Sequence, residues 1–309
     1  MLIKEYRITL PVTVEQYYLA QLYMVAKETQ EITKQSKVGE GIQVLKNEPF
    51  KNEKGEGQYT LKHFHIASRL PKWLRKILPK KSMVIIEESW NAFPYCLTSY
   101  SSPFLKKFKF SVETMHLADK GETKNALNCD KKTLKKRGVI KIDVVNDPLP
   151  KKSEFDVTTK ETECGILPLK GKKWVEKADV VMTCYKLVKV EFPYWGSQKR
   201  VEKLVQKKAI HEVFTDTHRK LLCWADLWFS LTIENIREIE GETKRIYEIK
   251  VKEEKKRQGE KGEKDEKDER STSDSESDDD DDDDDEKITE LKEKEETSSS
   301  SSEENDDSD

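Results

Sequence analysis

A division of charge and aromatic residues near residue 250 constrains the fold of this chain most. Residues 251–309 contain 28 Asp and Glu, 11 Lys and Arg, and no aromatic residue. Within them Asp278 to Asp285 form an unbroken run whose charges repel one another. Such a segment has too little apolar surface to offset the entropy lost on ordering. We therefore expect a disordered acidic tail over 251–309.

Residues 1–250 are the part that can build a core, and they form one expected domain. They hold all six Trp and carry 46 basic against 32 acidic residues, a net charge of +14 that the tail reduces to −3 overall. No apolar run approaches 18 residues, and no signal peptide is expected, so we expect no membrane span. The five cysteines show no CxxC pair, as is typical of reduced thiols in the cytoplasm: Cys96, Cys129, Cys164, Cys184 and Cys223.

Hydrophobic patterning in residues 1–250 predicts an α+β domain with a mostly antiparallel sheet and several long helices. The pattern Thr13-Val-Glu-Gln16 predicts a capping box that begins a helix running to about Ile32. Further helices are expected at 71–78 and 197–229, and at 233–250 behind a Thr232 cap. Strands are expected at 2–10, 41–46, 57–69, 82–88, 93–100, 107–116, 138–145 and 182–194. Most of 117–180 shows no clear pattern.

The usual catalytic signatures are absent from the sequence. There is no GxSxG, HExxH, Gly-rich phosphate loop or kinase motif, so we expect neither an enzyme nor a cofactor. His63 and His65 share one face of a predicted strand, but no third ligand has a suitable spacing, which favours a half-exposed face over a metal site. Cys223, beside Trp224 in an apolar stretch, is interpreted as a buried inert thiol.

The basic residues of the body do not indicate nucleic-acid binding, because aromatics are not interleaved with Arg as in RNA-binding sheets. The runs Lys131–Arg137 and Lys170–Lys173 are either solvated surface or contacts for anionic lipid headgroups. Tyr194 and Trp195 lie beside a chain break at Gly196. Such amphipathic aromatics favour either a membrane interface or a core, and the pattern leaves both open.

Ten short stretches of residues 1–250 occur in the order found in one protein family. They are Lys4–Arg7, Gln21–Tyr23, Gly57–Lys62, Trp90–Tyr95, Val112–Thr114, Cys184–Val188, Tyr194–Gly196, His218–Arg219, Cys223–Trp224 and Glu242–Arg245. Through them the chain resembles the phosphatidylinositol transfer proteins over nearly all of 1–250. Each stretch alone is a weak signal, but ten in order are specific.

The resemblance implies a START-like fold, in which a concave sheet and long helices enclose a cavity for one phospholipid. A lipid with about 30 methylenes, at about 0.8 kcal/mol each, would cost on the order of 20 kcal/mol to expose to water, so a carrier must enclose it. The family's inositol contacts fall on Thr60, Lys62, Asn91 and Glu240. Its phosphate and cavity contacts fall on Gln21, Cys96, Thr98, Thr114 and Lys186, and its membrane-docking pair on Tyr194 and Trp195.

Features of two subfamilies are mixed in this chain. Met1–Tyr6 and Val190–Phe192 resemble the membrane-associated retinal-degeneration-B type, whereas Cys96 resembles the soluble type, which exchanges phosphatidylinositol for phosphatidylcholine. The resemblance therefore implies a carrier of phosphatidylinositol and phosphatidylcholine that reaches membranes transiently. The alternatives are a carrier of phosphatidylinositol and phosphatidic acid, or a lipid-sensing scaffold whose acidic tail recruits a protein partner.

Overall fold

The structure, a computed structural model, describes residues 1–36, 41–65, 84–103, 106–148, 154–191 and 210–271. It divides the chain into two units, 1–257 and 258–309, which are described separately. The strands are β1 (Leu2–Leu10), β2 (Gly41–Asn52), β3 (Gly55–His65), β4 (Val84–Ala92), β5 (Tyr95–Ser101), β6 (Lys109–Leu117), β7 (Gly138–Ile142) and β8 (Met182–Glu191). The helices are α1 (Val14–Gln35), α3 (Lys131–Lys136), α4 (Trp174–Lys177), α6 (Ile210–Cys223), α7 (Ala225–Trp228) and α8 (Ile233–Ser271).

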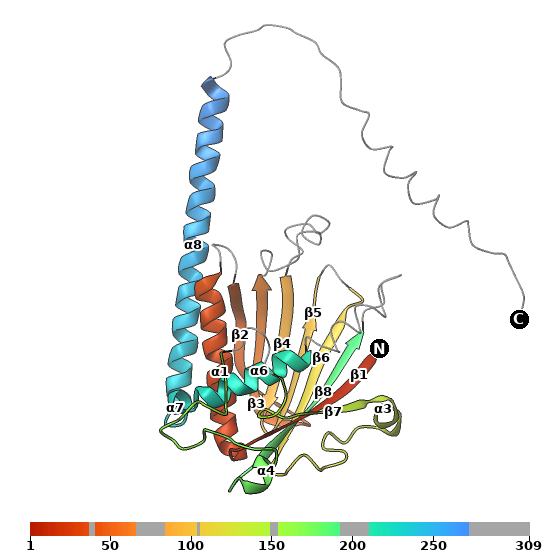
Figure 1. Ribbon diagram of the computed structural model, residues 1–309. Coiled ribbons are helices and arrows are strands. Elements are labelled where there is room, and N and C mark those ends of the chain that lie inside the picture. Colours follow the sequence, from red (N-terminus) through yellow and green to blue (C-terminus); the bar gives the residue numbers. More distant parts are fainter. Residues whose placement is uncertain (37–40, 66–83, 104–105, 149–153, 192–209, 272–309) are drawn as a thin grey trace, which may run out of the picture. The chain divides into compact units, whose positions relative to one another are not determined.

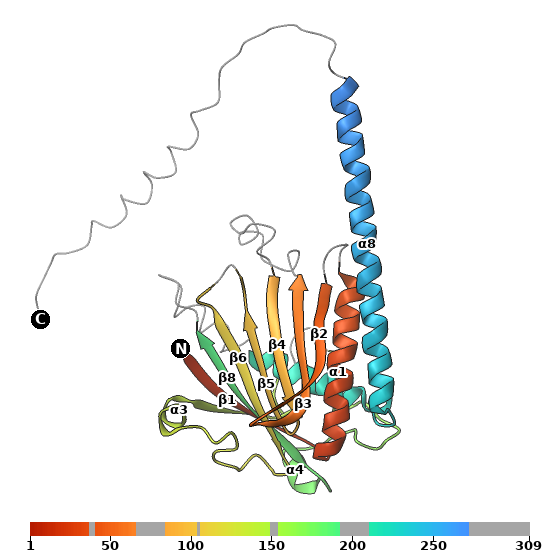
Figure 2. The ribbon, with the colours of Figure 1, turned by 180° about the vertical axis from the view of Figure 1, so that it is seen from behind.

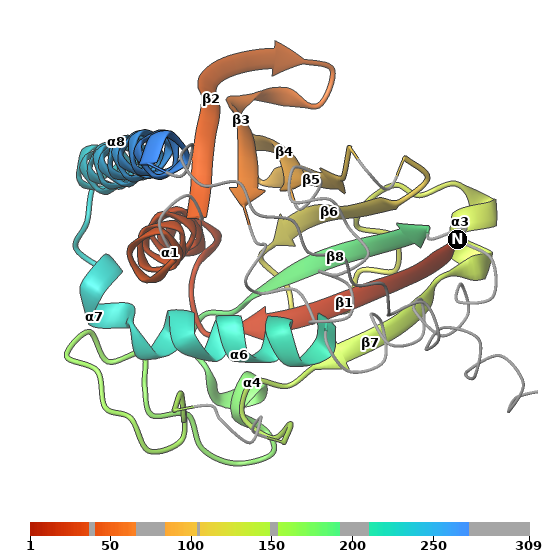
Figure 3. The ribbon, with the colours of Figure 1, turned by 90° about the horizontal axis from the view of Figure 1, so that it is seen from above.

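All the described strands belong to one sheet, in the order β2-β3-β4-β5-β6-β8-β1-β7 (Figure 1). Every neighbouring pair is antiparallel except β1 and β7, which are parallel. Seen from above, the sheet bends around α1 and α6 (Figure 3). The core between the sheet and these helices includes Tyr6 and Ile8 of β1, Ala20 of α1 and Leu222 of α6. The predicted α+β class and the concave, mostly antiparallel sheet are confirmed.

The capping box at the start of α1 is confirmed. The Gln16 amide donates to Thr13 Oγ1 at 3.1 Å, and the Thr13 amide donates to Gln16 Oε1 at 2.8 Å. The helix then runs to Gln35, slightly beyond the predicted end. Figures 1 and 2 place α1 and the first turns of α8 beside the β2 edge of the sheet. This arrangement gives α1 one face toward the sheet and another toward α8.

The single helix predicted over 197–229 is wrong within its described part. Residues 210–228 form two helices, α6 and α7, separated at Trp224, where φ is −96° and ψ is 15°. Trp228 turns back from α7 and donates its indole N–H to the Leu221 carbonyl at 2.8 Å, with only 1% of its surface exposed. The apolar run continues through the break because both helices bury side chains, so hydrophobicity alone did not reveal it. Residues 197–209 lie outside the described part.

Helix α8 does not end at 250 as expected but continues to Ser271. The residues after 250 are mainly Lys, Glu and Arg, which have high helix propensity. The expected disorder of this segment rested on its lack of apolar surface and did not take helix propensity into account. The described part of the second unit, 258–271, is therefore helical. The expected disorder of 272–309 lies outside the described residues and stays a prediction.

Within the first unit, α8 is attached to the end of α1 by polar contacts. The Lys250 ammonium donates to the carbonyls of Thr33, Lys34 and Ser36 at 2.5, 2.8 and 2.7 Å. The carbonyls at a helix C-terminus lack intrahelical partners and carry partial negative charge, so a lysine suits them well. Closer to its start, α8 contacts α1 through Glu242, which accepts from Gln30 at 3.0 Å. These contacts hold α8 along α1.

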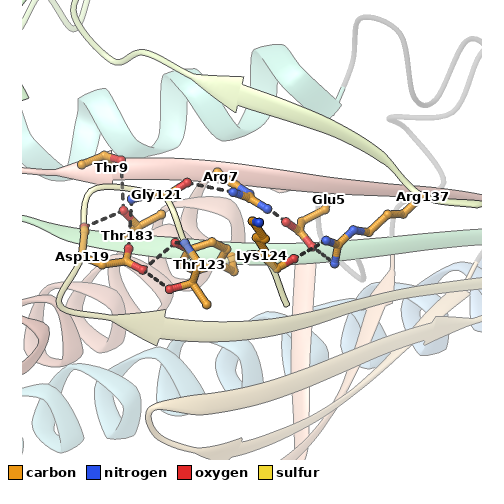
Figure 4. A network of polar contacts seen from close by, with 10 residues as sticks. Glu5, Arg7, Thr9, Asp119, Gly121, Thr123, Lys124, Arg137 and Thr183 are labelled. Atoms are coloured by element: carbon orange, nitrogen blue, oxygen red, sulfur yellow. Dashed lines mark hydrogen bonds and ion pairs between the residues drawn. The ribbon is translucent and has the colours of Figure 1, made fainter. Parts of the chain in front are cut away.

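A buried polar network fixes the segment after β6 against β1 (Figure 4). Glu5 is fully buried, and its carboxylate lies 2.8 Å from Arg7 Nε and 2.5 Å from an Arg137 guanidinium nitrogen. Arg7 also donates to the Gly121 carbonyl at 2.8 Å, and Arg137 donates to the Lys124 carbonyl. This segment belongs to the range 117–180, most of which shows no clear sequence pattern. It is held by contacts between residues far apart in the sequence, and such contacts leave no local periodicity.

Asp119 is the second acceptor of this network. It accepts from the Thr123 hydroxyl at 2.5 Å, the Tyr185 hydroxyl at 2.6 Å and the Gly121 amide at 3.0 Å. Burial raises the pKa of Asp119, but these hydrogen bonds outweigh burial and leave the pKa below 3.8. A depressed carboxyl pKa gives stability that is present above the unfolded pKa and lost as the pH falls.

Asp119→Asn is expected to lower the free energy of unfolding by about 2 kcal/mol at pH 7, because a charged acceptor of several hydrogen bonds is lost. Urea denaturation at pH 7 and pH 3 measures the effect, and the difference from wild type should shrink at the lower pH. Asp179→Asn, at an exposed position, is the matched control and should change little. Equal effects of the two substitutions would contradict the role assigned to Asp119.

Candidate functional site

A cavity of about 740 Å³ lies between the concave face of the sheet and helices α1, α6 and α8. The residues to which the resemblance assigned headgroup, phosphate or cavity contacts all line it, although they come from seven different elements. They are Gln21, Thr60, Lys62, Asn91, Cys96, Thr98, Thr114, Lys186 and Glu240. The structure thus brings together every one of these residues, and their contacts with a ligand stay a prediction.

Strand register explains how distant residues reach one cavity. Asn91 of β4 pairs with Cys96 of β5, Cys96 with Thr114 of β6, and Thr114 with Lys186 of β8. Directly paired residues point to the same face of a sheet, and residues two apart on one strand share that face. These four side chains therefore form one row across the cavity floor.

A second row lies beside the first, one pleat further along the strands. Thr60 of β3 pairs with Ser89 of β4, and Ser89 pairs with Thr98 of β5, whose hydroxyl lies 3.0 Å from that of Ser89. The sequence analysis did not single out Ser89, which also lines the cavity. The period-2 pattern places it on a strand face, but only the pairing of β4 with β5 shows that it belongs to this site.

Gly57 keeps the β3 backbone close to the polar rows. A Cβ atom at this position would lie 1.9 Å from the Asn91 carbonyl oxygen, well inside contact distance. The absence of a side chain at Gly57 therefore allows the close approach of β3 to Asn91. This is a physical reason for glycine in the stretch Gly57–Lys62.

Lys186 places a positive charge at the cavity, and no carboxylate in the described part of the chain pairs with it. Its ammonium lies 5.6 Å from the centre of the Phe214 ring, and no ion pair among the described residues includes it. Burial, together with the charge of Lys186, lowers the pKa of both His116 and His218 to about 3. The neighbouring histidines are therefore neutral at pH 7. A cation in such surroundings favours an anionic ligand, which supplies the missing counter-charge.

Lys62 has a different environment. Its ammonium lies 3.6 Å from Glu87 Oε1, and the two side chains are 10% and 12% exposed. The pair is neutral overall and lines the cavity. It offers hydrogen-bond donors from the ammonium and acceptors from the carboxylate, which suits an uncharged polar group.

Glu240 reaches the cavity from α8 and is held by two donors. Asn47 donates to its carboxylate at 3.1 Å and Arg237 at 2.6 Å. Gln58 of β3 in turn donates to Asn47 at 2.7 Å. This chain of hydrogen bonds links α8 to β2 and β3 at the polar end of the cavity.

Apolar side chains form the remaining walls. Val25 of α1, Leu45 of β2 and Val213 of α6 line the cavity and are 46%, 43% and 57% exposed. Phe64 and Phe214 contribute aromatic surface to the same walls. A cavity with a few polar groups and large apolar walls fits an amphipathic ligand. Helical periodicity can place a residue such as Val25 on an apolar face, but it cannot tell a cavity wall from a packed core.

Several sequence predictions fall elsewhere. Tyr194, Trp195 and the helix predicted at 71–78 lie outside the described residues. The rings of His63 and His65 are 6.3 Å apart, and within the described part of the chain no three His, Cys, Asp or Glu are arranged to hold a metal. Cys223 is only half-buried, and burial raises the pKa of its thiol to about 11, so it is protonated at neutral pH. No helix in the described ranges has the length and apolar character needed to cross a bilayer.

The family profile described as "Phosphatidylinositol transfer protein" matches residues 1–245. The chain belongs to this family. Its members are lipid-transfer proteins and not enzymes, and they have a START-like fold, which the curved sheet and covering helices of this chain match. The resemblance inferred from the ten stretches is therefore confirmed.

Named phosphatidylinositol transfer proteins are similar to this chain over most of its length. Phosphatidylinositol transfer protein 2 of Dictyostelium discoideum is 51% identical over 259 residues, covering 82% of this chain and 98% of that protein. Human membrane-associated phosphatidylinositol transfer protein 2 is 40% identical over 251 residues, which cover 78% of this chain but only 18% of the human protein. Drosophila melanogaster protein retinal degeneration B is also 40% identical, and 21% of it is covered.

Proposed function

We propose that this phosphatidylinositol transfer protein binds one phosphatidylinositol or one phosphatidylcholine at a time and carries it between membranes. The observation that carries the proposal is the charge of Lys186, which faces a cavity with apolar walls and has no carboxylate partner among the described residues. A phospholipid supplies both an anionic phosphate for that charge and acyl chains for the walls. The lipid is the cargo, and the function needs no cofactor.

The polar rows divide between the parts of the headgroup. In our proposal, Gln21, Thr98, Thr114 and Lys186 hold the phosphate, and Thr60, Lys62, Asn91 and Glu240 hold the inositol ring. Cys96 lies between these groups: its thiol donates to Asn91 Oδ1 at 3.0 Å, and Gln21 donates to its sulfur at 3.9 Å. A small, weakly polar thiol leaves room for a choline group, which supports phosphatidylcholine as the second cargo.

Exchange requires contact with a membrane. We assign docking to Tyr194 and Trp195, because interfacial aromatics combine an apolar ring with a polar edge. The five free cysteines support a cytoplasmic location, from which the protein would reach membranes transiently. The acidic residues that follow α8 are the segment that we assign to recruitment of a protein partner.

Native mass spectrometry of the full chain tests the proposed cargo. The protein is incubated with vesicles containing phosphatidylinositol, phosphatidylcholine, phosphatidylserine and phosphatidic acid in equal amounts, and is then re-isolated. We expect one phospholipid per chain, with phosphatidylinositol and phosphatidylcholine predominating. Phosphatidic acid in place of phosphatidylcholine would overturn the second cargo, and a protein that acquires no phospholipid would overturn the proposed function.

A further inference from the structure

Two lysines that line the cavity, Lys186 and Lys62, differ in their counter-charge. Lys186 has no ion pair among the described residues, whereas Lys62 is paired with Glu87 at 3.6 Å. Only 8% of Lys62 and 9% of Glu87 is exposed. Removing two charges from water is unfavourable unless their remaining hydrogen-bonding positions are satisfied. The residue that neutralises Lys62 therefore needs an explanation beyond general stability.

Glu87 is placed by the strand register between two partners. On β4 it pairs with Lys62 of β3 on one side and with Tyr100 of β5 on the other. Burial raises the pKa of Tyr100, and so do the charge of Glu87 and a hydrogen bond to it. The Tyr100 hydroxyl is therefore a donor to the Glu87 carboxylate. A carboxylate has about four acceptor positions, so Lys62 and Tyr100 leave positions that face the cavity.

The chemistry of the pair matches two neighbouring hydroxyl groups. A hydroxyl can donate to the free acceptor positions of Glu87, while the next hydroxyl accepts from the Lys62 ammonium, and hydrogen bonds to charged groups are the strong ones. Thr60 and Ser89, in the adjacent row, supply further hydroxyl partners. A choline group has no hydroxyl to donate. A ring that carries an additional phosphate would bring a negative charge toward Glu87 and be repelled.

We propose that Glu87 is a specificity-determining residue, which forms with Lys62 a neutral acceptor–donor pair that selects an uncharged polyol headgroup over choline and over phosphorylated polyols. This inference rests on the proposed function and adds to it the residue that keeps the ring site neutral. The Glu87 carboxylate accepts hydrogen bonds from the hydroxyl groups of the ring. It also neutralises the charge of Lys62, which would otherwise attract anions.

The test measures lipid selection by Glu87→Gln. Wild type and variant are incubated with vesicles of phosphatidylcholine, phosphatidylinositol and phosphatidylinositol 4-phosphate, and bound lipids are identified by native mass spectrometry. We expect the ratio of bound phosphatidylinositol to phosphatidylcholine to fall about tenfold in the variant. The ratio of phosphorylated to unphosphorylated phosphatidylinositol should rise, because Lys62 is left unpaired.

Glu88→Gln is the matched control. Glu88 is the next residue of β4 and points to the opposite face, where it accepts from the Tyr59 hydroxyl at 3.0 Å. Its substitution should leave both ratios unchanged. A second variant, Lys62→Met/Glu87→Met, removes the pair as a unit and avoids an isolated buried charge, so it should stay folded while selecting phosphatidylcholine.

The outcomes separate the alternatives. If either Glu87 variant stays folded and keeps the wild-type ratios, the specificity role is wrong. If Glu87→Gln unfolds and the double variant retains the wild-type selection, the pair is structural only, and the inference is again overturned. Failure of the wild type to acquire any phospholipid would instead contradict the proposed function, so the two failures are distinguishable.

Discussion

Lys186→Met is expected to lower the affinity for both phosphatidylinositol and phosphatidylcholine by about 100-fold. The two lipids share a phosphate, and Lys186 has no carboxylate partner among the described residues that would compete for its charge. A hydrogen bond to a charged group is worth about 1.5–3 kcal/mol, and the upper part of this range corresponds to a factor of about 100. Equilibrium competition between vesicles and protein, with fluorescent analogues of both lipids, measures the change.

The same substitution should not destabilise the unloaded protein. Methionine removes a charge from an apolar setting, so the free energy of unfolding should stay constant or rise. Lys189→Met is the matched control, since Lys189 lies on the other face of β8 and pairs with Glu113 at 3.5 Å. Equal loss of both lipids by Lys189→Met, or a large loss of stability in Lys186→Met, would show that Lys186 is a structural rather than a phosphate-binding residue.

Acidification from pH 7 to pH 5 is expected to lower the free energy of unfolding of the unloaded protein by about 4 kcal/mol. Burial lowers the pKa of His116 and His218 to about 3, against 6.5 for an ordinary histidine. Between these values the unfolded chain binds more protons, so stability falls as the pH falls, by about 1.4 kcal/mol per pH unit for each histidine. Below about pH 3 both states are protonated and this contribution to stability is lost.

Hydrogen bonds show why both rings are neutral. His116 Nδ1 donates to the Pro94 carbonyl at 2.7 Å and His218 Nδ1 to the Phe214 carbonyl at 2.6 Å, so Nε2 of each neutral ring is an acceptor. The Tyr17 hydroxyl donates to His218 Nε2 at 3.2 Å. Protonation of Nε2 of His218 would require the Tyr17 hydroxyl to turn from donor to acceptor and would place a positive charge in a site with little access to water.

Urea denaturation at intervals between pH 5 and pH 7 measures the dependence, above the range where most carboxylates titrate. His116→Gln or His218→Gln alone should remove about half of the slope, and the double variant should remove most of it. A double variant with the wild-type slope would assign the acid sensitivity to other groups. The slope is the informative quantity, because each substitution also changes the absolute stability.

Local patterns predicted those features that depend on neighbours in sequence. The capping box at Thr13 and Gln16 and the strands β1 and β8 are of this kind. The parallel pairing of β7 with β1 could not be predicted, because it joins residues more than 130 positions apart and leaves no local signal. The break at Trp224 was missed for a related reason, since only the packing of Trp228 reveals it.

The residues of the cavity also differ in whether the sequence could predict them. Lys186 and Thr60 were found through the family resemblance, since periodicity alone places them only on strand faces. Glu87 was missed, although it is one of the least exposed carboxylates of the cavity. Its role depends on the register of β3, β4 and β5, which sets Lys62 and Tyr100 beside it. Pairing between strands, rather than the pattern along one strand, determines which charges neutralise one another.

The position of β1 inside the sheet has a consequence for biosynthesis. Its neighbours β7 and β8 begin at Gly138 and Met182, so the second partner of β1 emerges from the ribosome more than 170 residues after Leu10. At about 5–20 residues per second, the first strand waits roughly 10–30 s for its antiparallel partner. During this interval Ile3, Tyr6 and Ile8, all buried in the folded protein, have no sheet to join. Nascent chains of this protein therefore expose an apolar strand early, which makes residues 2–10 a target for ribosome-associated chaperones and gives slow folding governed by late strand pairing.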